Sequence, residues 1–168
     1  MSDALPWERV REAEPPRDPA LVVDLRRCLG CHACSIACKT ENETPLGEFR
    51  MRVRWLQRPD RDQLAFVPVF DPDACDDGSR RTRAGLDPAC VTACPSKALN
   101  FGDLADPEDP IHELAGAATP LAPAEAGVSL KDNVTYIGAE DWMADKLHRG
   151  AALDPRDEDI IYEQGGGA

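Results

Sequence analysis

One stretch decides the fold of this chain, Cys28-Leu-Gly-Cys31-His-Ala-Cys34-Ser-Ile-Ala-Cys38. Its cysteines follow the pattern Cys-x2-Cys-x2-Cys-x3-Cys, which binds cubane iron–sulfur clusters. Three thiolates at three-residue steps on a tight loop can bind three corners of one cube, and the small Gly30 lets the backbone come close to it. The fourth thiolate is one helical turn further on and points away. We therefore expect Cys28, Cys31 and Cys34 to share one [4Fe-4S] cluster and Cys38 to bind a second.

Two other uses of cysteine fit this pattern less well. Structural zinc is bound by two separated cysteine pairs, and four cysteines in such a short stretch do not form such pairs. A disulfide framework requires an even number of cysteines in a secreted chain, whereas this chain has 7 and no recognisable signal peptide. The sequence therefore favours a cluster over zinc or disulfides.

A second cysteine segment, Cys90-Val-Thr-Ala-Cys94-Pro95, has the spacing that completes such a motif. In ferredoxins with two clusters, the cysteine before the proline binds the cluster of the other motif. Crosswise pairing then adds Cys94 to the first cluster. The second cluster takes Cys38, Cys90 and the one cysteine upstream of Cys90, which is Cys75.

Composition limits the possible partners. The chain of 168 residues has a formal net charge of -12 and a pI of about 4.6, which excludes nucleic acid and anionic membrane surfaces as direct partners. No stretch of about 18 apolar residues predicts a membrane span. Because no targeting signal is recognised, we expect the protein in the cytoplasm, or membrane-associated or exported only through a partner subunit.

Hydrophobic patterning predicts an α+β, ferredoxin-like fold with two clusters and extended N- and C-terminal arms. The order of strand, cluster loop, helix and strand occurs twice. We expect an N-terminal arm over 1–19, a two-cluster domain over 20–104, and a partner-binding extension over 105–168 with a disordered end. Strands are predicted at 20–24, 50–56, 64–70, 98–101 and 133–137, and helices at 33–41, 88–94 and 139–148. The segment 107–123, which is rich in alanine and proline, is predicted to be a connection along the surface.

The cysteine motifs also resemble a known family. Residues 34–47, with Lys39 where simple ferredoxins carry proline, look like the first motif of the iron–sulfur electron-transfer subunits in molybdopterin oxidoreductases of the dimethyl sulfoxide reductase family. Residues 75–107, which include Gly85-Leu-Asp-Pro-Ala-Cys90, are similar to the fourth and last motif of those subunits. Asn133-Val-Thr-Tyr-Ile137 resembles the segment that closes their C-terminal region. The resemblance covers residues 20–137.

This chain departs from the family in two ways. Typical members have four motifs and four clusters, whereas here the unit that carries motifs two and three is missing, which implies a shortened electron path. Gly78 also stands where the family has a cysteine. Three alternatives for the second site follow: a [3Fe-4S] cluster on three thiolates, a [4Fe-4S] cluster with Asp76 or Asp77 as the fourth ligand, or no cluster and a free Cys75 thiol.

The resemblance implies an electron-transfer subunit without its own catalytic site. His32, His112 and His148 are each solitary, so the sequence provides no catalytic constellation. The implied partner is a molybdopterin-containing catalytic subunit, and a membrane-anchor or other redox subunit is a further partner. We expect Trp7, Trp142 and Met143 to anchor the partner. The alternatives are a free-standing ferredoxin that carries electrons by diffusion and a structural or redox-sensing cluster protein.

Overall fold

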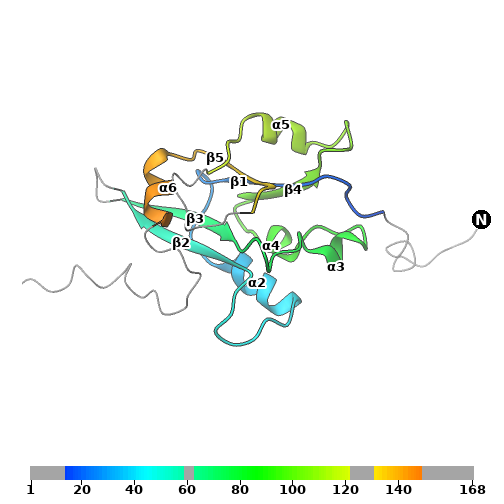
Figure 1. Cartoon of the computed structure of the whole chain (residues 1–168), viewed down its shortest axis with the longest axis horizontal. Helices are drawn as coiled ribbons and strands as arrows, with labels where there is room; N and C mark the ends of the chain where they lie inside the picture. The colour runs from blue at the N-terminus through cyan, green and yellow to red at the C-terminus, as the bar shows by residue number, and fades with distance from the viewer. Residues whose placement is uncertain (1–13, 59–62, 122–130, 149–168) are drawn as a thin grey trace, which may run out of the picture.

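Two small β-sheets and five short helices make up the part of the chain that the computed structural model describes, residues 14–58, 63–121 and 131–148 (Figure 1). The first sheet has the strand order β4-β1-β5, and the second is the hairpin β2-β3. The fold is therefore mixed α+β, as predicted. The expectations for Trp7 and for the C-terminal end concern residues outside the described ranges. The strands are β1 (Pro19–Asp24), β2 (Met51–Gln57), β3 (Leu64–Phe70), β4 (Leu99–Asp103) and β5 (Val134–Ile137).

β1 is the central strand of the first sheet. It pairs antiparallel with β4, where Leu21 is opposite Phe101, and parallel with β5, where Leu21 is opposite Val134. Because alternate side chains of a strand point to opposite faces, β1 contributes to two cores. Leu21 and Val23 belong to the larger core, and Val22 packs with Ile111 in a smaller one. This two-sided burial explains why β1 is an unbroken apolar run.

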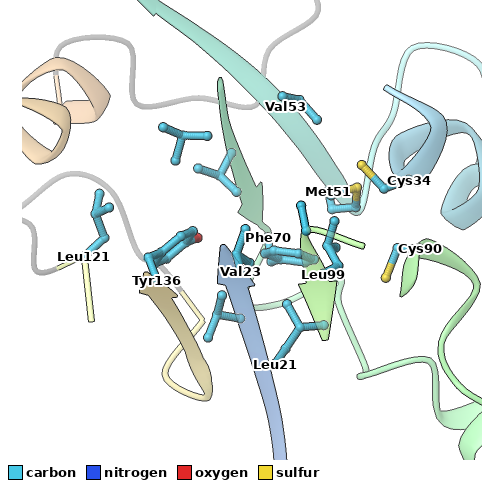
Figure 2. Packing of buried hydrophobic residues seen from close by; sticks show 14 of the residues in the cluster. Leu21, Val23, Cys34, Met51, Val53, Phe70, Cys90, Leu99, Leu121 and Tyr136 are labelled. Atoms are coloured by element: carbon cyan, nitrogen blue, oxygen red, sulfur yellow. The ribbon is translucent and has the colours of Figure 1, made fainter. Parts of the chain in front are cut away.

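The β2-β3 hairpin packs on the first sheet through the larger core. Figure 2 shows Tyr136 of β5 and Phe70 of β3 in this core. Cys34 and Cys90 lie at the end of the core next to the two helices that carry them. Tyr136 is only 2% exposed, and its hydroxyl donates a hydrogen bond of 2.8 Å to the backbone carbonyl of Pro68. Pro68 is tolerated because β3 pairs only with β2 and therefore is an edge strand.

The helices are α2 (Ala33–Glu41), α3 (Ser79–Thr82), α4 (Ala89–Thr92), α5 (Ile111–Gly116) and α6 (Asp141–His148). α2 has the predicted bounds, whereas α4 is only one turn of the helix predicted for 88–94. The segment 107–123, predicted as a surface connection, contains a helix that the sequence did not predict, α5. The carboxylate of Asp109 accepts hydrogen bonds from the N–H groups of Ile111 and Asp103, both 2.8 Å long, and so joins the start of α5 to β4. Ile111 is 2% exposed, which holds α5 on the sheet.

α6 packs inward. Met143 and Leu147 are 4% and 5% exposed and belong to the larger core, against which the half-buried Trp142 also packs. The expectation that Met143 anchors a partner is therefore wrong, because its side chain is used to complete the core. The start of α6 is held to the end of β2 by Arg58, which binds Glu140 through two hydrogen bonds of 2.5 and 3.0 Å.

Candidate iron–sulfur site

The first group of cysteines combines the loop before α2 with the end of the α4 segment. Cys34 and Cys94 are buried, Cys28 is half-buried and Cys31 is exposed. Burial raises the pKa of Cys28, and negative charge on Cys94 and Cys31 raises it further. Burial raises the pKa of Cys34 to about 12, again with a contribution from charge on Cys28 and Cys94. The structure thus brings Cys94 into electrostatic range of cysteines that lie about 60 residues earlier in the chain.

Aromatic side chains of the hairpin support the loop of the first group. Gly30 has a φ of 68°, and a Cβ atom at this position would lie 2.5 Å from the ring of Phe66. The indole N–H of Trp55 donates a hydrogen bond of 3.3 Å to the carbonyl of Gly30, and the Trp55 and Phe66 rings meet edge to face. Glycine is therefore needed here for its positive φ and for the approach of Phe66, a reason that the motif alone did not reveal.

Hydrogen-bond donors surround the cysteine sulfurs. The backbone N–H of Ala98 lies 3.2 Å from the Sγ atom of Cys94, and the side-chain amide of Asn42 lies 3.7 Å from the Sγ atom of Cys38. Burial would raise the pKa of Cys94. Hydrogen bonds from the backbone of Leu99, Ala98 and Ser96 and from the side chain of Ser96 outweigh the effect of burial, so the pKa of Cys94 is lowered. The hydroxyl of Ser35, next to Cys34, is buried without a hydrogen-bond partner. Such donors suit a cluster, whose thiolates and sulfides accept hydrogen bonds.

The second group of cysteines lines one pocket. Cys38 of α2, Cys75 of the loop after β3 and Cys90 of α4 surround a space of about 440 Å³, part of which is open to solvent. Burial raises the pKa of Cys75 to about 11 and raises that of Cys90 as well, and charge on Cys38 adds to both shifts. Charge on Cys34 also raises the pKa of Cys90, so the two groups of cysteines are neighbours.

Basic residues lie beside the second group. The guanidinium of Arg50 donates a hydrogen bond of 2.7 Å to the carbonyl of Ala74 and lies 2.5 Å from Asp76. Burial raises the pKa of Cys38, whereas the positive charge of Arg50 lowers it, and Lys131 has the same lowering effect at Cys75. Arg50 therefore lies beside the cysteines, and Arg54 of β2 is only 7% exposed, so neither arginine belongs to a solvated face.

Lys39 joins the end of α2 to the loop that follows it. Its amino group donates hydrogen bonds to the backbone carbonyls of Thr44, Pro45 and Glu48, the first and last of which are 3.0 and 2.8 Å long. This contact gives a structural role to the lysine that stands where simple ferredoxins carry proline.

Sequence reasoning named the seven cysteines but missed most groups around them. Asn42 could have been found, because it follows Cys38 by four residues and such pairs share one face of a helix. Lys131 and the N–H of Ala98 could not, because only the fold brings them to the cysteines. Within the described residues, no three side chains of histidine, cysteine, aspartate or glutamate converge on a position for one metal ion. A cluster places a different demand on the protein, because each thiolate binds its own iron atom.

None of the helices in the described part of the chain is long and apolar enough to cross a membrane. No family model matches the chain. It is 34% identical to the B subunit of tetrathionate reductase from Salmonella typhimurium over 87 residues, which cover 52% of this chain and 32% of the relative. It is 33% identical to the putative iron-sulfur B subunit of dimethyl sulfoxide reductase from Halobacterium salinarum over 104 residues, which cover 58% of this chain and 36% of that relative. The chain thus spans about a third of the length of these two relatives.

The B chain of polysulfide reductase from Wolinella succinogenes is covered more fully. The two proteins are 26% identical over 167 residues, which take in 87% of the relative but only 63% of this chain. The alignment therefore crosses a stretch of the relative for which this chain has no counterpart. The homology and the seven cysteines imply iron–sulfur clusters. Over part of its length, the chain is a homologue of the iron–sulfur electron-transfer subunits of reductases, as its cysteine motifs predicted.

Proposed function

We propose that this chain is an electron-transfer subunit that relays single electrons to or from a molybdopterin-containing catalytic subunit. The first [4Fe-4S] cluster is bound by Cys28, Cys31, Cys34 and Cys94, and the second cluster by Cys38, Cys75 and Cys90. One observation carries the proposal: each group of thiols combines the N-terminal motif with the C-terminal half of the chain, and the two groups interact through Cys34 and Cys90.

When bound, the clusters would supply one-electron redox chemistry at potentials between about -700 and +450 mV. The residues of this chain would position the clusters and tune these potentials. The N–H of Ala98 and the amide of Asn42 donate to thiolates of the first and second site, which favours the more negative, reduced state of a cluster. Arg50 adds positive charge at the second site and acts in the same direction.

Exposed apolar side chains near Cys31 in the sequence support electron exit at the first site. Cys31 is exposed, and Leu29, two residues before it, and Ile36, five residues after it, are 62% and 58% exposed. A partner that covered these side chains would gain apolar contact area. We therefore place the docking surface for the catalytic subunit around Leu29, Cys31 and Ile36.

Support for a ferredoxin-like unit comes from the strand pairing. In the two successive segments β1-α2-β2 and β3-α4-β4, the first strand of each pairs antiparallel with the last strand of the other. This arrangement is expected of two repeated segments in which each segment supplies a cysteine to the cluster of the other. The stretch of the polysulfide reductase relative without a counterpart here supports the absence of the inserted unit and a shortened electron path.

Iron content tests the two ligand sets. After anaerobic reconstitution, the protein should contain about seven to eight irons, and Cys94→Ala should lose the first cluster while the spectrum of the second remains. Cys75→Ala should show the opposite pattern. Four irons in the unaltered protein, with a freely alkylated Cys75, would refute the second site.

Co-purification from the native host tests the subunit role. Leu29→Glu and Ile36→Glu should reduce retention of a molybdenum-containing partner at least tenfold, with unchanged iron content. Leu46→Glu is the matched control, because Leu46 is also apolar and is 98% exposed but follows α2. Recovery of the unaltered protein alone, with both clusters intact, would favour the free-standing ferredoxin instead.

A further inference from the structure

The acidic residues after Cys75 are already engaged in contacts. Asp76 faces Arg50, at 2.5 Å, and accepts a hydrogen bond of 2.7 Å from the hydroxyl of Ser79. Both of its carboxylate oxygens therefore have partners within the protein. A carboxylate in this position has little need of an iron ion to balance its charge.

The side chain of Asp77 is better shielded from water than that of Asp76, with 17% of it exposed against 44%. One carboxylate oxygen accepts a hydrogen bond of 3.0 Å from the side-chain amide of Asn133, and the other lies 3.1 Å from the amino group of Lys131. The side chains of Lys131 and Asp77 are only 16% and 17% exposed, so this ion pair is shielded from water. The same amide of Asn133 also donates a hydrogen bond of 2.9 Å to the carbonyl of Pro19. Asn133 thus joins the loop of Cys75 to the start of β1 and to the segment before β5.

The position where the family has its fourth cysteine is closed to a side chain. Gly78 has a φ of 65°, and a Cβ atom there would lie 2.9 Å from Cβ and 3.0 Å from Cα of Pro88. Pro88 immediately precedes α4, which carries Cys90. A side chain at position 78 would therefore have to displace the segment that positions another ligand.

We propose that the second cluster is bound by Cys38, Cys75 and Cys90 only, and that Asp77 is a positioning residue that anchors the Cys75 loop through Asn133 and Lys131. This inference rests on the cluster-binding part of the proposed function. Three thiolates match the three irons of a [3Fe-4S] cluster, so each iron has one protein ligand.

The anchor acts on Cys75 through the backbone. Cys75 and Asp77 are only two residues apart, so a fixed backbone conformation at Asp77 restricts where Cys75 can lie. Asp77 has a φ of 58°, a left-handed conformation that is costly for a residue with a Cβ atom. The contacts of its carboxylate with Asn133 and Lys131 hold the residue in this conformation, and so fix the course of the loop that carries Cys75.

Four variants, reconstituted anaerobically in the full chain, separate anchoring from ligation. Asp77→Asn keeps an oxygen that can accept the hydrogen bond from Asn133, so it should retain about seven irons and the unaltered electron paramagnetic resonance signal of a three-iron cluster. Asp77→Ala and Asn133→Ala lose this contact and should lose about three irons each. Asp73→Ala is the control, because Asp73 is an exposed acidic residue of the same loop.

The signal of the first cluster shows in each sample whether the chain has folded. The proposal is overturned if the unaltered protein contains eight irons and Asp77→Asn converts a four-iron cluster to a three-iron cluster, which would identify Asp77 as a ligand. It is also overturned if Asn133→Ala keeps its full iron content. Four irons in the unaltered protein would instead contradict the two-cluster function itself, so the two failures are distinguishable.

Discussion

Replacement of Gly30 by alanine tests how the hairpin shapes the loop of the first cluster site. The new Cβ atom would lie 2.5 Å from Cδ1 and 2.7 Å from Cε1 of Phe66, far inside van der Waals contact. The positive φ of 68° adds a second penalty. A left-handed conformation costs a residue with a Cβ atom about 1–2 kcal/mol, and overpacking costs about 1–3 kcal/mol. We therefore expect Gly30→Ala to lower the free energy of unfolding by about 2–5 kcal/mol.

Gly47→Ala is the matched control. Gly47 also has a positive φ, of 88°, but no atom lies within 4 Å of the position that its Cβ would occupy. Only the conformational penalty applies, so this variant should lose about 1–2 kcal/mol. For a chain of this length, the apparent melting temperature should fall by about 4–20 °C for Gly30→Ala and by about 2–8 °C for Gly47→Ala.

The assay follows the loss of cluster absorbance on heating, together with iron content before heating. Gly30→Ala should also bind less iron at the first site, because Gly30 directly precedes Cys31. Gly30→Ala should cost less stability in a Phe66→Ala background than in the unaltered protein, since the ring that the methyl group meets is then absent. Equal shifts for Gly30→Ala and Gly47→Ala, or the same cost of Gly30→Ala in both backgrounds, would refute the role of Phe66.

Three further predictions concern the core, one ion pair and the clusters. Tyr136→Phe leaves a buried backbone carbonyl without its hydrogen bond and should cost about 1–3 kcal/mol in urea unfolding. Side-chain hydrogen bonds from Arg26 lower the pKa of Asp24 below its usual 3.8, so the stability that this pair adds is present above about pH 4 and is lost only as the pH falls through the folded-state pKa. The difference in melting temperature between the unaltered protein and Asp24→Asn should therefore be constant from pH 6 to 8, and a change within this range would contradict the assignment. Removal of the clusters by a chelator under reducing conditions should make all seven thiols open to alkylation and lower the melting temperature. If neither the alkylation of the thiols nor the melting temperature changes, the result would argue against cluster binding.

Elements with a strong local pattern were predicted closely from the sequence. α2 and β3 have the expected bounds, and the strand expected at 20–24 begins only one residue earlier, at Pro19. α5 was missed because it is only 6 residues long, and because its start is fixed by Asp109, whose carboxylate accepts hydrogen bonds from the N–H groups of Ile111 and of Asp103 in β4. Hydrophobic periodicity cannot be recognised over so few residues, and it carries no information on hydrogen bonds between a side chain and the backbone.

The candidate site was also predicted only in part: the ligands were found from the sequence, and most of the groups around them were not. Cysteine spacing identified all seven thiols, because the distance between ligands along the chain is constrained by the cluster. The charges and hydrogen bonds around them come from residues such as Arg50, Asn133 and Lys131, which reach the site only after the sheets have paired. The parallel pairing of β5 with β1, in particular, brings the segment of Asn133 beside the loop of Asp77.

Residues 131–148 therefore complete the candidate site as well as the core. Tyr136 binds the hairpin, Met143 fills the larger core, and Asn133 holds the loop of Cys75. Loss of this segment would expose the interior between the two sheets and release one side of the second site. A purely partner-binding extension would predict that deletion from Asp141 onward weakens partner binding and leaves the cluster spectra unchanged. Because Met143 and Leu147 are core residues, the same deletion should instead lower the stability of the whole fold, and cluster retention should fall with it.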